Sequence, residues 1–266
     1  MAVAVDEREV EQVLDTGQPF LDLRPRARSP ASYLLLPGLL ALALFALYAW
    51  VGAQELDSIE RRFLTAPVLT AATVRHVEIT VLVTVFIVVL AVPAGIVLTR
   101  PFARRVAPMI IGLANAGQSV PSIGVIALLA LVWTIGLRTA VVAIVAYGLL
   151  PVLRNTMVGL QQVDRAVIEA GRGMGMTKRG VLARIELPLA VPVILAGVRT
   201  ALVIAVGTAA LATFVNGGGL GDIINQGLVQ RRFPITLTGG VLVAVLALLI
   251  DWSAGIAEDA LRPKGL

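Results

Sequence analysis

Uncharged apolar runs alternate with charged segments along most of this chain of 266 residues. A membrane-spanning helix needs about 20 predominantly apolar residues. We therefore predict six spans, at residues 33–51, 79–98, 106–137, 139–153, 189–214 and 235–250. The third run is too long for one untilted span and contains Asn115, Ser119 and Pro121, so we place a break between Gln118 and Ser122. The pattern predicts an all-α integral membrane protein.

Composition supports this class and excludes others. Hydrophobic residues make up 58% of the chain and charged residues 15%, whereas soluble domains carry about a quarter charged residues. The mean hydropathy is +0.89. Without cysteine and with His76 as the one histidine, the chain predicts neither disulfides nor a metal cluster. The spans also lack a grouped nucleophile, acid and base, which argues against an intramembrane hydrolase.

The positive charges indicate orientation. Cytoplasmic loops of membrane proteins are enriched in Lys and Arg, so we interpret the basic residues as topology signals and not as a nucleic-acid surface. With both termini in the cytoplasm, the outer segments hold Arg61, Arg62, Arg75, Arg138, Arg231 and Arg232. The inner segments then hold Arg24, Arg26, Arg28, Arg100, Arg104, Arg105, Arg154, Arg165, Arg172, Lys178, Arg179, Arg184, Arg262 and Lys264. Residues 1–32 are predicted to be a cytoplasmic tail, and residues 33–266 a single transmembrane domain.

The segment 155–188 is the longest charged passage between two apolar halves. Its composition predicts a short helix at 163–172, which Gly171, Gly173 and Gly175 then loosen into a turn. Thr177 is placed to cap a second helix that runs to residue 185, before Pro188 restricts the chain as it re-enters the membrane. One face of that helix carries Val181, Leu182 and Ile185. From these residues alone, the hairpin either meets anionic lipid headgroups or is held by a soluble partner.

The order of residues in this segment resembles the EAA loop in the membrane-spanning subunits of binding-protein-dependent ABC importers. That family has a glutamate, two alanines, a glycine four residues later, and then isoleucine, any residue, leucine and proline. This chain departs from the pattern at Gly171, in the second alanine position, and at Leu182, where an aromatic residue is common. The residues that the resemblance implies for ATPase coupling are Glu169, Ala170, Gly171, Gly175, Leu182, Ile185, Leu187 and Pro188.

The resemblance also implies an assembly. We expect a type I ABC importer permease fold in the bacterial cytoplasmic membrane, with a cytoplasmic coupling loop at 155–188. A separate ATPase dimer would use ATP and Mg, so this chain would bind no cofactor and would not itself be an enzyme. The expected partners are that ATPase, an extracytoplasmic substrate-binding protein, a second copy or related permease, and the lipid bilayer.

Residues 118–123, 149–160 and 197–228 are similar to permeases that import quaternary-amine osmoprotectants such as glycine betaine, carnitine and choline. This similarity covers most of the chain from about residue 79 onward. We expect the same substrate class here. Two alternatives stay open: an importer of the same architecture for another small solute such as an amino acid, and an ATP-independent channel or structural membrane subunit.

Two further groups of residues are candidates for contact with substrate or partner. Polar groups near the predicted break either pack between helices or border a substrate path, and aromatic faces suit a quaternary cation. The path candidates are Asn115, Gln118, Ser119, Trp133, Tyr147 and Phe214. The predicted outer loop at 215–234 has no phosphate-binding pattern and forms a tight turn; the resemblance implies that it faces the binding protein through Asn216, Gly217, Gly218, Gly219, Gly221 and Asp222.

Overall fold

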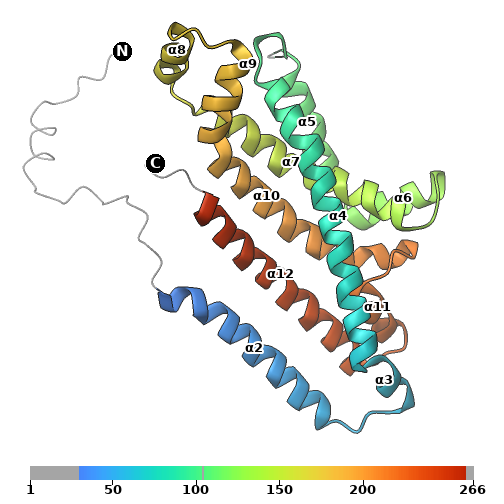
Figure 1. Ribbon diagram of the computed structural model, residues 1–266. Helices are drawn as coiled ribbons and strands as arrows, with labels where there is room; N and C mark the ends of the chain where they lie inside the picture. The colour runs from blue at the N-terminus through green and yellow to red at the C-terminus, as the bar shows by residue number, and fades with distance from the viewer. Residues whose placement is uncertain (1–29, 104, 262–266) are drawn as a thin grey trace, which may run out of the picture. The chain divides into compact units, whose positions relative to one another are not determined.

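The computed structural model describes residues 30–103 and 105–261, and this described part contains helices and no strands. In chain order the elements are α2 (Pro30–Gly52), α3 (Ser58–Phe63), α4 (Ala66–Leu98), η1 (Pro101–Ala103), α5 (Ala107–Gln118), α6 (Ser122–Val132), α7 (Leu137–Gln161), α8 (Arg165–Gly173), α9 (Lys178–Val181), η2 (Leu182–Glu186), α10 (Leu187–Ala209), η3 (Ala210–Val215), α11 (Leu220–Val229) and α12 (Phe233–Leu261) (Figure 1). The predicted all-α class is confirmed.

The chain divides into residues 1–37 and 38–266. Of the first part, only the beginning of α2 is described. The predicted cytoplasmic tail lies almost entirely outside the described residues, as do Arg104, Arg262 and Lys264. The rest of the description concerns residues 38–266.

Within the described residues, five helical runs are long and apolar enough to cross a membrane. They are α2, α4, α7, the continuous run from α9 to η3, and α12. The helices α5 and α6 make a sixth span if they are counted together, but they are bent by 94° at the residues between Gln118 and Ser122. The predicted break is therefore confirmed, and the predicted third span is a bent pair of helices.

Several helices extend beyond the predicted spans. The segment 54–75 lies between the first two predicted spans, yet it contains α3 and the first turns of α4. Pro67 does not interrupt α4 because it lies in the first turn, where its missing N–H has no intrahelical partner to lose. At their other ends, α7 continues to Gln161 and α12 to Leu261. Hydropathy located the apolar runs, and these helices continue beyond the ends of those runs.

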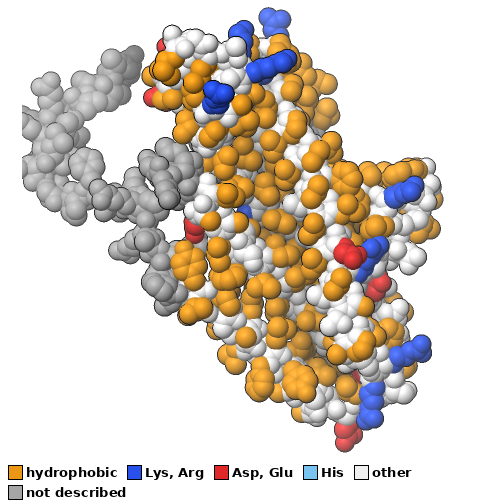
Figure 2. Space-filling model, viewed as in Figure 1, with side chains coloured by type: hydrophobic (Ala, Val, Ile, Leu, Met, Phe, Trp, Pro, Cys, Tyr) orange, Lys and Arg blue, Asp and Glu red, His pale blue; other side chains and the backbone are white. Residues whose placement is uncertain are grey.

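The core of residues 38–266 lies where α4, α7 and α10 pack against one another. Ile79, Ile87 and Ile144 are among its fully buried side chains. Small residues let α7 and α10 approach closely: a methyl group added at Gly159 would lie 3.1 Å from the Ala190 carbonyl oxygen. Apolar side chains also cover much of the visible surface (Figure 2), which suits a protein surrounded by lipid.

The charged ends of these helices fall on two sides. The helices α8 and α9 and the end of α4 lie at one end of the bundle, whereas α3 and the beginning of α12 lie at the other (Figure 1). We call these the inner and outer ends, following the positive-inside assignment.

Candidate functional site

The helix α8 begins and ends with capping interactions that its sequence supplies. The Asp164 carboxylate accepts a hydrogen bond from the Ala166 amide at 2.8 Å. At the other end, the amide of Gly175 donates to the Arg172 carbonyl at 2.9 Å, and the amide of Met176 donates to the Gly171 carbonyl at 3.2 Å. This pair of bonds is a Schellman motif, whose C′ residue is left-handed; Gly175 has φ +87°. The predicted short helix and glycine turn are confirmed.

The second helix of the segment is capped as predicted, but it does not stop before the membrane. The Thr177 hydroxyl accepts a hydrogen bond from the Gly180 amide at 3.2 Å and begins α9. The chain then passes through the π-helical turn η2 into α10 without a break. Pro188 lies in the first turn of α10. The second helix was predicted to end at residue 185, but the helical run continues into the predicted fifth span. The amide of Leu187 closes the π turn on the Leu182 carbonyl, and Pro188, which has no amide to donate, follows in the first turn of α10.

Gly171 is explained by its packing. It is buried, and a methyl group added there would lie 2.5 Å from Cδ1 of Ile185. The same methyl group would lie 3.7 Å from Cγ2 of Val181, which is fully buried. The glycine that departs from the family pattern therefore lets α8 lie close against η2, and α8 still spans nine residues.

The eight predicted coupling residues divide into two sets. Glu169, Ala170, Gly175 and Pro188 are exposed. The remaining four face other parts of the segment or the bundle: Gly171 and Ile185 contact one another, and Leu182 and Leu187 pack against the small apolar cluster of Leu160, Ala190 and Ile194. We call residues 164–188 the coupling element. It presents an exposed surface with Glu169 on it and is anchored to the bundle by its apolar residues.

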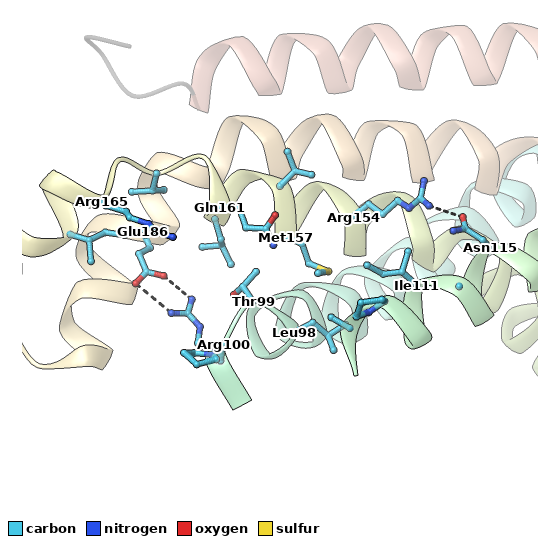
Figure 3. A pocket seen from close by; sticks show the side chains of 18 of the residues that line it. Leu98, Thr99, Arg100, Ile111, Asn115, Arg154, Met157, Gln161, Arg165 and Glu186 are labelled. Atoms are coloured by element: carbon cyan, nitrogen blue, oxygen red, sulfur yellow. Dashed lines mark hydrogen bonds and ion pairs between the residues drawn. The ribbon is translucent and has the colours of Figure 1, made fainter. Parts of the chain in front are cut away.

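A cavity of about 1170 Å³ lies beside the coupling element, between the end of α4, α5, α7, α8 and η2 (Figure 3). Its charged lining consists of Arg100, Arg154, Arg165, Arg172 and Glu186. Two of these arginines interact with side chains from other elements that line the cavity. Arg154 donates to the Asn115 side-chain oxygen at 2.8 Å, and Arg100 forms an ion pair with Glu186 at 2.7 Å.

The structure brings together four of the six path candidates. The Gln118 amide nitrogen donates to the Tyr147 carbonyl at 2.8 Å, and the Tyr147 hydroxyl donates to the Gln118 carbonyl at 3.4 Å. The Ser119 hydroxyl donates to the carbonyl of Asn115, which lines the cavity. Trp133 and Phe214 have exposed side chains, and within the described residues no ring contact or side-chain hydrogen bond joins them to the other four.

The segment 215–234 was predicted to be an outer loop, but part of it forms the helix α11, so less of it is loop than expected. Its glycine turn is tight, with φ +86° at Gly218 and +96° at Gly219. Gly217, Gly219 and Gly221 are buried, Gly218 and Asp222 are half-buried, and Asn216 is exposed. A methyl group at Gly221 would lie 1.9 Å from the Ala210 carbonyl oxygen. Most of this turn therefore serves internal packing, and Asn216 is its most accessible member.

Sequence reasoning missed several polar contacts between distant elements. The Arg100–Glu186 pair joins residues that are 86 apart, and Glu186 occupies the position of the family pattern that accepts any residue. Arg199, the charged residue within the predicted span 189–214, forms two hydrogen bonds, each of 2.6 Å, with Asp251, which lies inside α12. The described residues contain no group of three metal-ligating side chains.

The described part of the chain is an all-helical bundle with several candidate membrane spans and a charged element at its inner end. Residues 91–263 match the family described as "Binding-protein-dependent transport system inner membrane component". The chain belongs to this family and is a multi-pass membrane protein. Its family therefore associates it with a transport system that also contains a binding protein.

Comparison with characterised proteins agrees with this assignment. The chain is 43% identical to the carnitine transport permease protein OpuCD of Listeria monocytogenes over 71% of its own length and 84% of that protein. It is 40% identical to the choline transport system permease protein OpuBB of Bacillus subtilis over 73% of its length and 88% of that protein. It is 38% identical to the osmoprotectant import permease protein OsmY of Salmonella typhimurium over 66% of its length and 75% of that protein.

Solved structures confirm the predicted fold. A chain of the inward-facing MetNI methionine ABC transporter superposes with a TM-score of 0.65 at 23% identity, over 75% of this chain and 100% of that one. A chain of an amino acid ABC transporter superposes with a TM-score of 0.62 at 16% identity, over 78% and 100%. This chain therefore has the fold of type I ABC importer permeases.

Proposed function

We propose that this chain is the permease subunit of an ATP-driven importer for a quaternary-amine osmoprotectant such as glycine betaine, carnitine or choline. The observation that carries the proposal is the identity of 38–43% to permeases named for carnitine, choline and osmoprotectants, over 66–73% of the chain. The coupling element supports the ATP-driven part, because its exposed surface is anchored directly on a membrane-spanning helix.

In the proposed assembly, an ATPase dimer contacts the exposed residues of the coupling element from the cytoplasm. Glu169 is exposed near the middle of α8 and provides a polar anchor for the ATPase. ATP and Mg act in the ATPase, and closure of the ATPase pair displaces the coupling element as a rigid body. Because α9, η2 and α10 form one continuous helical run, the displacement reaches the membrane without an intervening loop.

The substrate arrives at the opposite end. A separate binding protein docks near Asn216 and the glycine turn and releases the substrate toward the bundle, and two identical or related permeases together form the path. Asn115, Gln118, Ser119 and Tyr147 border that path in each copy. Trp133 and Phe214 offer exposed aromatic faces, which attract a quaternary cation that has no proton to donate.

Uptake competition tests the substrate class. Cells that carry the full transport system accumulate labelled glycine betaine, and we expect excess unlabelled carnitine or choline to compete while methionine does not. Uptake of labelled methionine, with no uptake of labelled glycine betaine, carnitine or choline, would assign the chain to an amino acid importer of the same fold.

The role of Glu169 is tested separately by Glu169→Gln, with Glu55→Gln as the control because Glu55 is exposed in the outer segment. We expect Glu169→Gln to reduce both ATPase copurification and substrate-stimulated ATP hydrolysis, and Glu55→Gln to change neither. Unchanged transport in Glu169→Gln would remove Glu169 from the ATPase contact.

A further inference from the structure

The ion pair between Arg100 and Glu186 joins two elements that are distant in the sequence. Nη2 of Arg100 lies 2.7 Å from Oε2 of Glu186, and Nη1 lies 3.4 Å from Oε1 (Figure 3). The third guanidinium nitrogen, Nε, donates to the Ile96 carbonyl at 3.2 Å. The Glu186 side chain is only 6% exposed and that of Arg100 is 28% exposed. The guanidinium group is therefore held by both the carboxylate and its own helix.

The Arg100–Glu186 pair links the coupling element to the inner end of α4. Glu186 is the last residue of the π turn η2 and directly follows Ile185, which contacts Gly171 of α8. Arg100 directly follows the C-cap of α4, which is Thr99. The pair thus connects the coupling element to α4, in addition to its covalent connection to α10. A π turn inside a helix is itself a frequent mark of a functional site.

Apolar packing alone would fix the position of α4 relative to α10 less strictly. Toward the inner end, the contacts between α4 and α10 are apolar, and such contacts are non-directional. Nearer the outer end, a hydrogen bond between Nε2 of His76 and the Val206 carbonyl, at 2.9 Å, joins the two helices. A guanidinium–carboxylate fork requires a defined geometry. In a partly buried site it also resists separation, because either partner alone would keep an uncompensated charge.

We propose that the Arg100–Glu186 pair transmits movement of the coupling element to α4, so that α4 and α10 move together when the ATPase closes. This inference rests on the proposed function. The pair also forms part of the wall of the inner cavity, so a joint movement of α4 and η2 changes the cavity that the path residue Asn115 lines. Arg100 and Glu186 are positioning residues in this account, and neither needs to touch the substrate.

The test uses the complete transporter reconstituted with its ATPase and binding protein. Glu186→Gln and Arg100→Gln each remove one charge, and the exchanged double variant Arg100→Glu with Glu186→Arg restores opposite charges. The matched control is Asp251→Asn, which weakens the Arg199–Asp251 pair between α10 and α12, where the arginine is also 28% exposed. Folded yield, ATPase copurification, ATP hydrolysis and uptake are measured for each variant.

The discriminating quantity is the amount of substrate transported per ATP hydrolysed by intact complexes, which a merely stabilising contact would leave unchanged. We expect each single variant to lower it about tenfold, within the usual range of coupling between sites, while the ATPase still copurifies. The exchanged variant should recover part of the loss, and Asp251→Asn should stay within about twofold of the parent.

Two results would overturn the inference. One is a transport-to-ATP ratio in Glu186→Gln equal to that of the parent complex. The other is a loss that matches the loss of folded complex and that the exchanged variant does not recover. Failure of the parent complex itself to perform ATP-dependent uptake would instead contradict the proposed function, so the two failures are distinguishable.

Discussion

The inner helix α8 and the outer helix α11 end in the same hydrogen-bond pattern but use different residues for it. Gly175 occupies the left-handed position after α8, with φ +87°. After α11, the corresponding position is Arg231, with φ +54°. Its amide donates to the Leu228 carbonyl at 3.2 Å, and the next amide, of Arg232, donates to the Gly227 carbonyl at 2.7 Å. A Schellman turn thus forms with either residue, at a higher conformational cost for arginine.

Glycines at the two ends of the bundle also differ, as Gly175 after α8 and Gly221 at the beginning of α11 show. A methyl group at Gly175 would meet nothing within 4 Å, whereas one at Gly221 would lie 1.9 Å from the Ala210 carbonyl oxygen. The inner glycine is required by backbone conformation at an exposed turn, and the outer glycine by close packing. Glycine is therefore required for different physical reasons at the two ends, and substitutions should distinguish these reasons.

The largest effect is expected for Gly221→Ala. Its added methyl group meets a backbone atom that cannot move away as a side chain would, and we expect a loss of at least about 3 kcal/mol in the free energy of unfolding. Folded yield and the thermal midpoint in detergent measure this loss. Gly207→Ala is the matched control because nothing lies within 4 Å of its added methyl group, and it should retain the parent midpoint or raise it. Equal behaviour of both variants would refute the packing explanation.

A smaller loss is expected for Gly175→Ala. A left-handed alanine costs about 1–2 kcal/mol relative to glycine, and no steric clash adds to it. The same thermal measurement applies, with Gly175→Asn as the comparison, because asparagine tolerates positive φ better than alanine does. Alanine should therefore lower the midpoint more than asparagine. The reverse order would show that the turn is not limited by backbone conformation.

The outer turn should respond in the opposite direction. Arg231→Gly removes the side chain from a left-handed position and should raise stability by about 1 kcal/mol. Arg231 is exposed and has positive φ. Arg138→Gly, in the first turn of α7, is a control that should lower stability, because glycine weakens a helix. A loss of stability in both variants would mean that contacts of the Arg231 side chain contribute more free energy than its left-handed backbone conformation costs.

The smallest effect is expected for Gly171→Ala. Its methyl group clashes with the flexible end of the Ile185 side chain, while Met176 and Val181 lie at ordinary contact distances of 3.6 and 3.7 Å, so rotation of the Ile185 side chain limits the loss to about 1 kcal/mol. Ile185→Val removes the contacting Cδ1 atom. The double variant should therefore be more stable than the sum of the two single changes predicts, as a double-mutant cycle would measure. Strict additivity of the two stability changes would show that the residues at positions 171 and 185 do not interact.

The sequence predicted those features that local chemistry determines. The apolar runs located the membrane-spanning helices, and the glycine and proline near Gln118 located the break in the third span. Thr177 and Gly175 predicted a cap and a turn because hydrogen bonding and φ at those positions depend on adjacent residues. Composition predicted the short helix that carries Glu169, and the structure shows this residue exposed on α8.

Features that depend on tertiary packing were not predictable in the same way. Nothing in the local pattern of Glu186 pairs it with Arg100, and nothing near Gly171 indicates the contact with Ile185. Hydropathy could not show that α9 continues through a π turn into α10, because charged residues between Lys178 and Glu186 interrupt the apolar pattern there. The 94° bend between α5 and α6 likewise depends on how these helices pack against α7.

The most direct test of the account places the two ends of the protein on opposite sides of a sealed vesicle. Complexes of this chain with its ATPase are reconstituted so that α8 faces the lumen, with ATP and Mg enclosed and the binding protein with labelled carnitine outside. We predict accumulation of carnitine above its external concentration, and none when ATP is omitted or when it is present only outside. Carnitine flux that is equal with and without ATP would contradict the account and identify a channel.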